Sequence, residues 1–168
     1  KMLLTAKAYA EGGRALAIWC ATLLDLEHNH PDEKVRAESA ELVALLTPIV
    51  KAFITDNGLQ ATVMCQQVFG GHGYIKEAGM EQFVRDARIN MIYEGTNTIQ
   101  ALDLLGRKVL GNNGATLKKL GKIIARFAEE EGVNEKMSEF INPLAMMGDQ
   151  VTKFTTEIGF KGMQNPDE

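Results

Sequence analysis

The stretch Q-V-F-G-G-H-G-Y-I-K-E-A-G-M-E-Q-F-V-R-D-A-R-I-N-M-I-Y-E-G-T-N-T-I-Q, residues Gln67–Gln100, decides how the chain is organised. It begins as the last turn of an apolar helix, which runs into the glycine-rich turn Gly70–Gly73. After a short amphipathic segment, a single carboxylate, Glu94, precedes Gly95 and a new helical pattern. No other part of the sequence sets glycines, a lone acid and a helix start so close together, so we expect any chemistry to lie here.

Composition narrows the class of protein. A chain of 168 residues that is 45% hydrophobic suits one domain with a core, or a domain with a short appendage. Its net charge of −4 gives no basic surface of the kind that binds nucleic acid, so nucleic acid is not an expected partner. No apolar run approaches the roughly 20 residues that a membrane-spanning helix needs. Cys20 and Cys65 lie in apolar helical patterns, which predicts free, buried thiols and a cytoplasmic location.

The pattern of apolar residues predicts an all-α fold. The sequence has only four prolines and almost no alternating β-branched runs. Thr47 suits the N-cap position and Pro48 the first position of a helix, so a new helix is predicted to begin there. Residues 56–58 are typical of a turn, but the apolar residues keep their helical spacing across them, so we expect the helix to continue. Apolar spacing, with Asp32 and Thr96 as further N-caps, predicts an antiparallel bundle of helices over residues 2–27, 33–46, 49–68, 79–90 and 97–110.

A boundary is predicted at Gly111–Gly114. We therefore expect a helical bundle over residues 1–111 and a C-terminal extension over 112–168. The extension should contain one helix ending by Gly132, a second over 134–158 and a frayed end, with Pro143 bending the second helix. Because two helices bury little surface alone, the extension should pack on the bundle or on other parts of the protein. The chain starts as if inside a helix, so we expect it to be a piece of something longer.

The glycine turn has two interpretations from local physics. Closely spaced glycines let backbone N–H groups approach a phosphate. Against this, the preceding helix presents its negative end, no strand precedes the glycines, and Gly70 is an ordinary residue after a helix C-terminus. In the loop that contains His28, His30 and Asp32, a metal site is conceivable, but we favour a surface loop without metal.

Glu94 also has two interpretations. A lone acid in a turn is most often a solvated carboxylate. Alternatively it is a general base, with the following helix start fixing the backbone and Gly95 leaving room for a ligand to approach. We expect Arg85, Asp86 and Arg88 to form ion pairs that hold the short helix in place.

Three segments, taken together, resemble the C-terminal helical domain of the flavin-dependent acyl-CoA dehydrogenases. They are Q-V-F-G-G-H-G-Y (67–74), R-D-A-R-I (85–89) and I-Y-E-G-T-N-T-I-Q (92–100), and the resemblance covers residues 1–111. Residues 100–108 and the helical tail resemble a bacterial branch of the family with an added C-terminal segment. The family's N-terminal helical domain, its β domain and the first helix of this domain are missing, and they supply most of the acyl pocket and much of the flavin site.

The resemblance implies a role for each matching residue. Glu94 corresponds to the base that removes the α-proton of an acyl-CoA thioester while the β-hydrogen leaves as hydride to flavin N5. Gly95 lies against the thioester. The resemblance implies that two segments contact the cofactor FAD: Gln67, Val68, Phe69, Gly70 and Gly71 form the first, and Thr96, Asn97 and Thr98 the second. The first segment mainly contacts the FAD that the neighbouring subunit binds. Many members have an acid or glutamine in place of Thr98, so that match is one of backbone only.

The chemistry agrees with these residue types. The α-proton of a thioester is weakly acidic, so the base must lie close, and a carboxylate that substrate shields from water holds a proton more tightly. FAD is the hydride acceptor that side chains cannot replace. The resemblance thus implies an enzyme that makes trans-2-enoyl-CoA, passes electrons to electron-transfer flavoprotein and forms a homodimer or homotetramer. The fragment alone should bind FAD weakly or not at all and be inactive. The alternative is a non-catalytic helical oligomerisation or interaction module.

Overall fold

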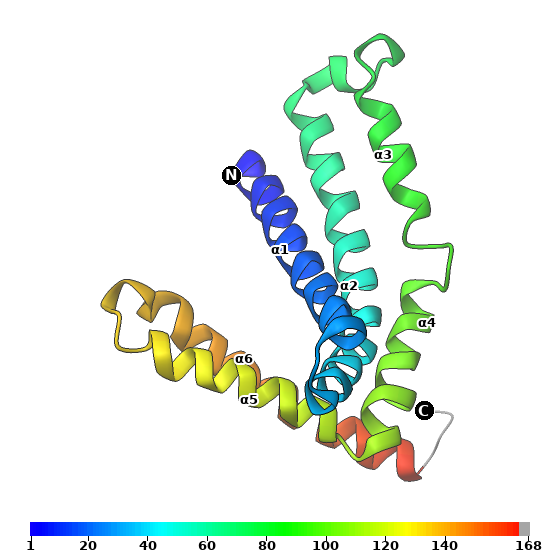
Figure 1. Cartoon of the computed structure of the whole chain (residues 1–168). Coiled ribbons are helices and arrows are strands. Elements are labelled where there is room, and N and C mark those ends of the chain that lie inside the picture. The colour runs from blue at the N-terminus through cyan, green and yellow to red at the C-terminus, as the bar shows by residue number, and fades with distance from the viewer. Residues whose placement is uncertain (165–168) are drawn as a thin grey trace. The chain divides into compact units, whose positions relative to one another are not determined.

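The computed structural model describes residues 1–164 and is helical throughout, apart from short connections. No strand occurs among these residues, so the predicted all-α class is confirmed. In the same range no helix is long and apolar enough to cross a membrane. The α-helices, labelled in Figure 1, are α1 (Met2–Asn29), α2 (Glu33–Val68), α3 (Met80–Ile89), α4 (Asn97–Leu102), α5 (Ala115–Glu131) and α6 (Ser138–Gln164).

The chain divides into two compact units, Lys1–Leu104 and Leu105–Glu168. In the first unit α2 is the central element, with α1 packed on one side and α3 and α4 on another (Figure 1). In the second unit α5 and α6 form a helical hairpin. The first unit carries the candidate site, and its architecture follows from the length of α2.

Helix α2 corrects one prediction. Instead of ending near Leu46 and restarting at Thr47, the helix runs without a break through Pro48 and is 36 residues long in total. The Thr47 hydroxyl donates a hydrogen bond to the Val43 carbonyl at 2.7 Å rather than capping a new helix. A proline inside a helix costs about 3 kcal/mol. Pro48 is buried, as are Leu45 and Leu46 in the turn before it, so burial of this part of α2 offsets the local penalty.

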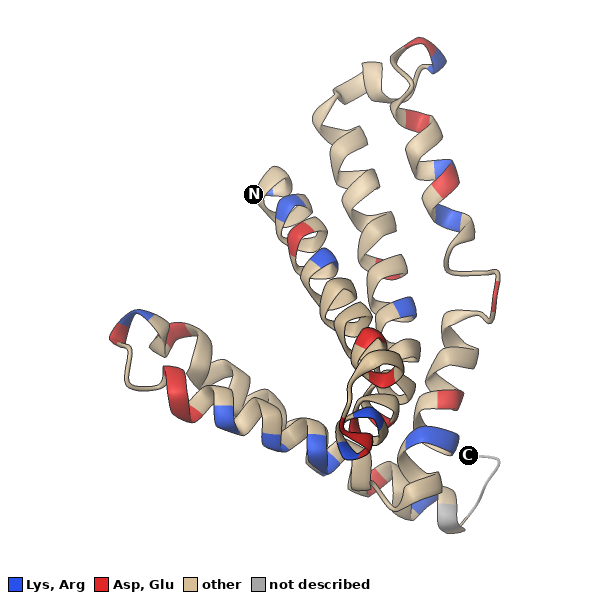
Figure 2. Ribbon diagram, in the orientation of Figure 1, with Lys and Arg blue, Asp and Glu red and all other residues tan. Residues whose placement is uncertain are grey.

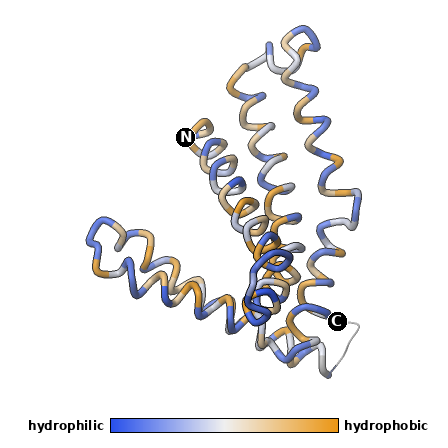
Figure 3. The backbone as a smooth tube through the Cα atoms, in the orientation of Figure 1, coloured by the Kyte–Doolittle hydropathy of each residue, from blue (hydrophilic) through white to orange (hydrophobic). Residues whose placement is uncertain are grey.

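The core of the first unit lies between α1 and α2. Leu45 and Leu46 are 1% and 2% exposed, and Leu42 of α2 and Leu23 of α1 are also buried. Figure 3 shows the apolar residues recurring along both helices. Asp32 caps α2 as predicted, accepting a hydrogen bond from the Lys34 N–H at 2.8 Å. The predicted continuity across 56–58 is confirmed, since these residues lie inside α2.

Cys20 and Cys65 are free thiols, as predicted, but both are half-buried rather than fully buried. Burial raises the pKa of the Cys20 thiol above its ordinary value. At a given pH a raised pKa leaves less thiolate, the form that reacts with alkylating agents. We expect iodoacetamide to modify Cys20 in a Cys65→Ser variant with a pH midpoint above that of a free cysteine peptide. A midpoint at or below the peptide's would contradict the burial of this thiol.

The segment after α4 also departs from prediction. Instead of one α-helix over 97–110, the chain has the six residues of α4, a π-helix over Asp103–Val109 and a 3₁₀ turn over Leu110–Asn112. Gly106 lies within the π-helix, where it lowers the cost of leaving α-helical backbone. The two compact units divide inside this π-helix.

The hairpin of the second unit begins after Asn113 and Gly114, both in the left-handed region, with φ of 54° and 72°. Helix α5 ends at Glu131, close to the predicted end at Gly132, and Pro143 lies inside α6. Residues 159–164 continue α6, so the prediction that they fray is wrong; the predicted frayed residues 165–168 lie outside the described range.

Candidate active site

The turn between α3 and α4 holds Glu94 in an unusual backbone conformation. Glu94 has φ 54° and Gly95 has φ 82°, so two successive residues are left-handed. Such a φ is uncommon for a residue with a Cβ and costs about 1–3 kcal/mol, so surrounding structure must impose it. As predicted, Thr96 caps α4, its hydroxyl accepting a hydrogen bond from the Ile99 N–H at 3.3 Å.

Polar side chains of α2 hold this turn in place. The Lys51 ammonium donates to the Gly95 carbonyl at 2.7 Å and to Asn97 Oδ1 at 2.8 Å. The Asn97 amide in turn donates to Asp56 Oδ1 at 2.7 Å and to the Thr55 hydroxyl at 3.1 Å. All of these residues are half-buried. The network fixes the backbone beneath Glu94 from residues more than forty positions earlier in the chain.

The opposite side of the turn is closed by Gln100. Its amide donates to the carbonyls of Glu94 and Gly95 at 3.3 and 3.4 Å. A Cβ on Gly95 would lie 2.8 Å from the Gln100 amide nitrogen. The φ of Gly95 favours glycine at this position, and a larger residue would also displace the Gln100 amide.

Replacing Lys51 by methionine tests the anchoring network. The substitution removes the donor to the Gly95 carbonyl and to Asn97 Oδ1 and leaves both acceptors half-buried. We expect a loss of about 1–3 kcal/mol in the free energy of unfolding, measured by urea denaturation of this chain. Lys34→Met, at an exposed position of the same helix, is the control and should change stability by less than about 0.5 kcal/mol. Equal effects of the two substitutions would contradict the anchoring role.

The Glu94 carboxylate lies on the outside of the anchored turn. Glu94 is exposed, and within residues 1–164 no side chain or N–H donates a hydrogen bond to its carboxylate. Several apolar residues within eight positions of Glu94 in the sequence are left exposed by this chain. They are Ile89 (53%), Ile92 (50%), Tyr93 (48%), Ile99 (51%) and Leu102 (63%). Exposed apolar residues of this number on the segments before and after one turn are typical of a surface that another molecule or domain covers.

The glycine turn follows the C-terminus of α2. Gly70 adopts φ 61°, which is the usual role of a glycine after a helix. Gly73 is buried, and a Cβ there would lie 2.3 Å from the Gln66 carbonyl oxygen, so only glycine fits. The Gln66 amide donates to the Gly73 carbonyl at 3.1 Å and closes the turn.

The candidate cofactor residues of this segment are all accessible. Gln67, Val68, Phe69, Gly70 and Gly71 are exposed. No atom lies within 4 Å of a Cβ built on Gly70 or Gly71, so a flat or phosphate-bearing group can approach this backbone.

The structure does not bring the glycine turn and Glu94 together. Lys51, which anchors Gly95, and Gln67 lie sixteen residues apart on α2. At 1.5 Å per residue this places the two segments roughly 24 Å apart along the helix. One compact pocket in a single chain therefore cannot include both segments.

The remaining candidates have structural roles. Asp86 accepts a hydrogen bond from the Gln82 amide at 2.7 Å, and Arg88 contacts the Met91 sulfur at 3.8 Å. The ion pairs expected of Arg85, Asp86 and Arg88 do not form among residues 1–164, and Asp86 and Arg88 use these nearer, neutral partners instead.

His28 lies in the last turn of α1 rather than in a loop as predicted, and His30 follows the helix as its C-cap. His28 Nδ1 contacts the Leu24 carbonyl at 2.8 Å, and His30 Nδ1 accepts a hydrogen bond from the Asp32 N–H at 3.1 Å. In the described part of the chain no three His, Cys, Asp or Glu side chains are placed to hold a metal.

Comparison with known proteins decides the family. Residues 1–110 match the family model described as "Acyl-CoA dehydrogenase, C-terminal domain". The chain belongs to the acyl-CoA dehydrogenase family. It is 48% identical over 125 residues to 3-methylmercaptopropionyl-CoA dehydrogenase of Ruegeria pomeroyi. This alignment covers 74% of this chain and 21% of that protein.

Two other acyl-CoA dehydrogenases extend the comparison. A broad-specificity linear acyl-CoA dehydrogenase of Mycobacterium tuberculosis is 34% identical, with 82% of this chain and 23% of that protein covered. A butyryl-CoA dehydrogenase of Syntrophomonas wolfei is 31% identical, with 96% of this chain and 26% of that protein covered. The last alignment runs through nearly all of the second unit. The chain thus spans about a fifth to a quarter of the length of these acyl-CoA dehydrogenases.

Proposed function

We propose that this chain is the C-terminal part of a longer FAD-dependent acyl-CoA dehydrogenase and that Glu94 is its catalytic base. The enzyme would oxidise an acyl-CoA to the trans-2-enoyl-CoA and pass the electrons to electron-transfer flavoprotein. We further propose that residues 112–168 are an extension added to the family domain, that the enzyme is a cytoplasmic homodimer or homotetramer, and that the β domain and N-terminal helices complete its site.

The observation that carries the proposal is the anchored carboxylate. Glu94 is the acid of a turn that Lys51 and Asn97 fix, and exposed apolar side chains occur on the segments just before and after this turn. A base of this kind needs a fixed backbone and a surface from which bound substrate can exclude water. The chain provides both, and its family membership supplies the reaction.

The residues fit the flavin cofactor in part. The open backbone at Gly70 and Gly71 suits the adenosine diphosphate end, and the exposed Thr98 beside the Glu94 turn suits the ring end. Because these segments lie roughly 24 Å apart along α2, we propose that they serve different protomers. When bound, FAD accepts the β-hydrogen as hydride.

The contribution of this chain to the reaction is proton transfer and positioning. The Glu94 carboxylate takes the α-proton, and covering the surrounding apolar surface excludes water from that carboxylate. We propose that the Gly95 backbone lies against the thioester. The Asn97 amide is bonded to Lys51 and Asp56, so any Asn97 contact with the cofactor must come from its backbone.

The competing function is a helical interaction module, favoured by the exposed apolar residues of α3 and α4. The enzyme proposal is tested by Glu94→Gln in the full-length protein, with turnover and bound flavin both measured. A full-length protein that purifies without flavin and is indifferent to added FAD would instead support the interaction module.

The isolated chain gives a separate prediction. Because this chain leaves Glu94 exposed and keeps the two flavin segments apart, we expect it to bind FAD weakly or not at all. Mixed with FAD and an acyl-CoA, it should not bleach the flavin absorbance. Bleaching at a rate normal for an enzyme of this class would contradict the need for the other domains.

A further inference from the structure

The α5–α6 hairpin carries apolar stripes that it covers only in part. On α6 the apolar residues recur at alternating spacings of four and three, the pattern of a coiled-coil seam. They are Phe140, Leu144, Met147, Val151, Phe154 and Ile158, and all except the half-buried Leu144 are between 45% and 60% exposed. On α5 the same spacing relates Leu117, Leu120, Ile124 and Phe127.

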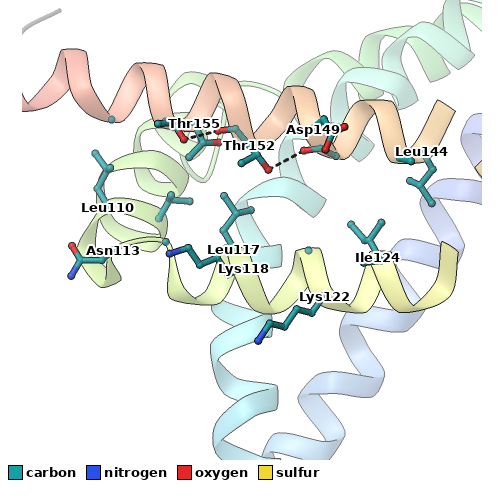
Figure 4. A pocket seen from close by; sticks show the side chains of 18 of the residues that line it. Leu110, Asn113, Leu117, Lys118, Lys122, Ile124, Leu144, Asp149, Thr152 and Thr155 are labelled. Atoms are coloured by element: carbon teal, nitrogen blue, oxygen red, sulfur yellow. Dashed lines mark hydrogen bonds between the residues drawn. The ribbon is translucent and has the colours of Figure 1, made fainter. Parts of the chain in front are cut away.

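The face between the two helices is different in character. A cavity of about 1040 Å³ separates them, and many of its lining residues are small: Gly121, Ala125 and Ala128 of α5, with Ala145, Gly148 and Gly159 of α6. Figure 4 shows Leu117 and Ile124 pointing into it from α5 and Leu144 from α6. The hairpin is therefore loosely closed, and most of the α6 stripe does not take part in closing it.

Both stripes lie on one flank of the hairpin. At 100° per residue, the centre of each stripe is rotated by roughly 90–110° from the centre of the cavity-lining face of its helix, in the same sense on both helices. Leu117 and Ile124 of α5 and Leu144 of α6 lie where the two faces meet, so they belong to a stripe and also line the cavity. Two antiparallel helices with rotations of the same sense present their stripes on the same side. Val151 and Phe154 of α6 and Phe127 of α5 thus form parts of one apolar face.

Charge is distributed unevenly along the hairpin. Around the turn, residues 126–139 carry five acids and two bases, a net charge of −3. The rest of the two helices, residues 115–125 and 140–164, carries five lysines and two acids, a net charge of +3. Figure 2 shows basic residues along α5 and acidic residues near the hairpin turn.

We propose that this flank binds a second copy of the same hairpin, antiparallel and related by a two-fold axis, to form a four-helix bundle. In that arrangement the acidic end of each copy faces the basic end of the other, and the apolar stripes meet in the centre. The heptad spacing suits helix-on-helix packing, and a hairpin with opposite charges at its two ends is complementary to itself. The interface would join two protomers through the second unit.

The first experiment measures the mass of this chain in solution by sedimentation equilibrium. One chain has a mass of 18.5 kDa. We expect Val151→Glu/Phe154→Glu to halve the mass of the wild-type assembly, because two charges would be buried in the bundle. Both positions are at least half exposed in the hairpin, so it should still fold. Met146→Glu, also on α6 and 65% exposed but outside the stripe, is the matched control and should keep the wild-type mass.

A charge exchange tests the antiparallel pairing itself. Lys119→Glu/Lys161→Glu makes both ends acidic, and Glu131→Lys/Glu139→Lys makes both ends basic. Each variant alone should have half the wild-type mass at low salt, whereas an equimolar mixture should recover it. A stripe variant with unchanged mass, a wild-type chain that is already monomeric, or a mixture that fails to associate would each overturn the proposal.

Discussion

Glu94→Gln in the full-length protein should lower turnover of an acyl-CoA by about 10²–10⁴-fold, the contribution of a positioned general base. Glutamine keeps the size and hydrogen-bonding shape of the side chain but cannot accept the α-proton. Since the Glu94 carboxylate makes no hydrogen bond within the described chain, the fold and the bound flavin should be unaffected. The measurements are steady-state turnover with an artificial electron acceptor and the flavin absorbance per protomer.

The control is Glu38→Gln, at an exposed position of α2. It should retain wild-type turnover and flavin. If Glu94→Gln also retained near-normal turnover with a full complement of flavin, Glu94 would not be the base. Loss of flavin together with turnover would point to a binding role instead.

Leu45→Ala should cost about 2–5 kcal/mol of the free energy of unfolding, the range for emptying a well-packed leucine site. Leu45 is the most buried leucine of the core, at 1% exposed, and it lies one helical turn before Pro48. Its packing helps α2 to pass through Pro48 without a break. Urea denaturation of this chain, followed by circular dichroism, measures the loss.

Leu4→Ala provides the comparison on the facing helix. Leu4 is 74% exposed on α1, so its truncation should change stability by less than about 0.5 kcal/mol. If Leu45→Ala were as mild as Leu4→Ala, the contact between α1 and α2 would not be the core of the first unit.

The elements that depend on local signals could be predicted from sequence. Asp32 and Thr96 cap helices as their residue types indicate. The helical spacing of apolar residues correctly predicted that the helix continues across residues 56–58. Pro48 shows where local rules fail. Thr-Pro is a strong local signal for the start of a helix, but the burial of this part of α2 outweighed it, and no local pattern reports that burial.

The candidate site shows the same division. Glu94, Gly95 and Thr96 are adjacent in sequence, so their association could be predicted. Lys51 and Asp56 were missed because they meet the turn only through the pairing of α2 with α4. The one available signal was a lysine and an aspartate five residues apart in an otherwise apolar helix stretch, and such pairs are common on solvated faces. The exposure of Glu94 could not be predicted either, because a local pattern does not report which elements or domains cover a side chain.

The most direct test of the central claim is exchange of the α-hydrogen in D₂O. The full-length protein would be mixed with an acyl-CoA analogue in which sulfur replaces the β-methylene, so that no hydride can leave. Mass spectrometry would then follow deuterium uptake at the α-carbon. We predict uptake with the wild-type protein and none above background with Glu94→Gln. Uptake at the wild-type rate by Glu94→Gln would show that another group removes the proton.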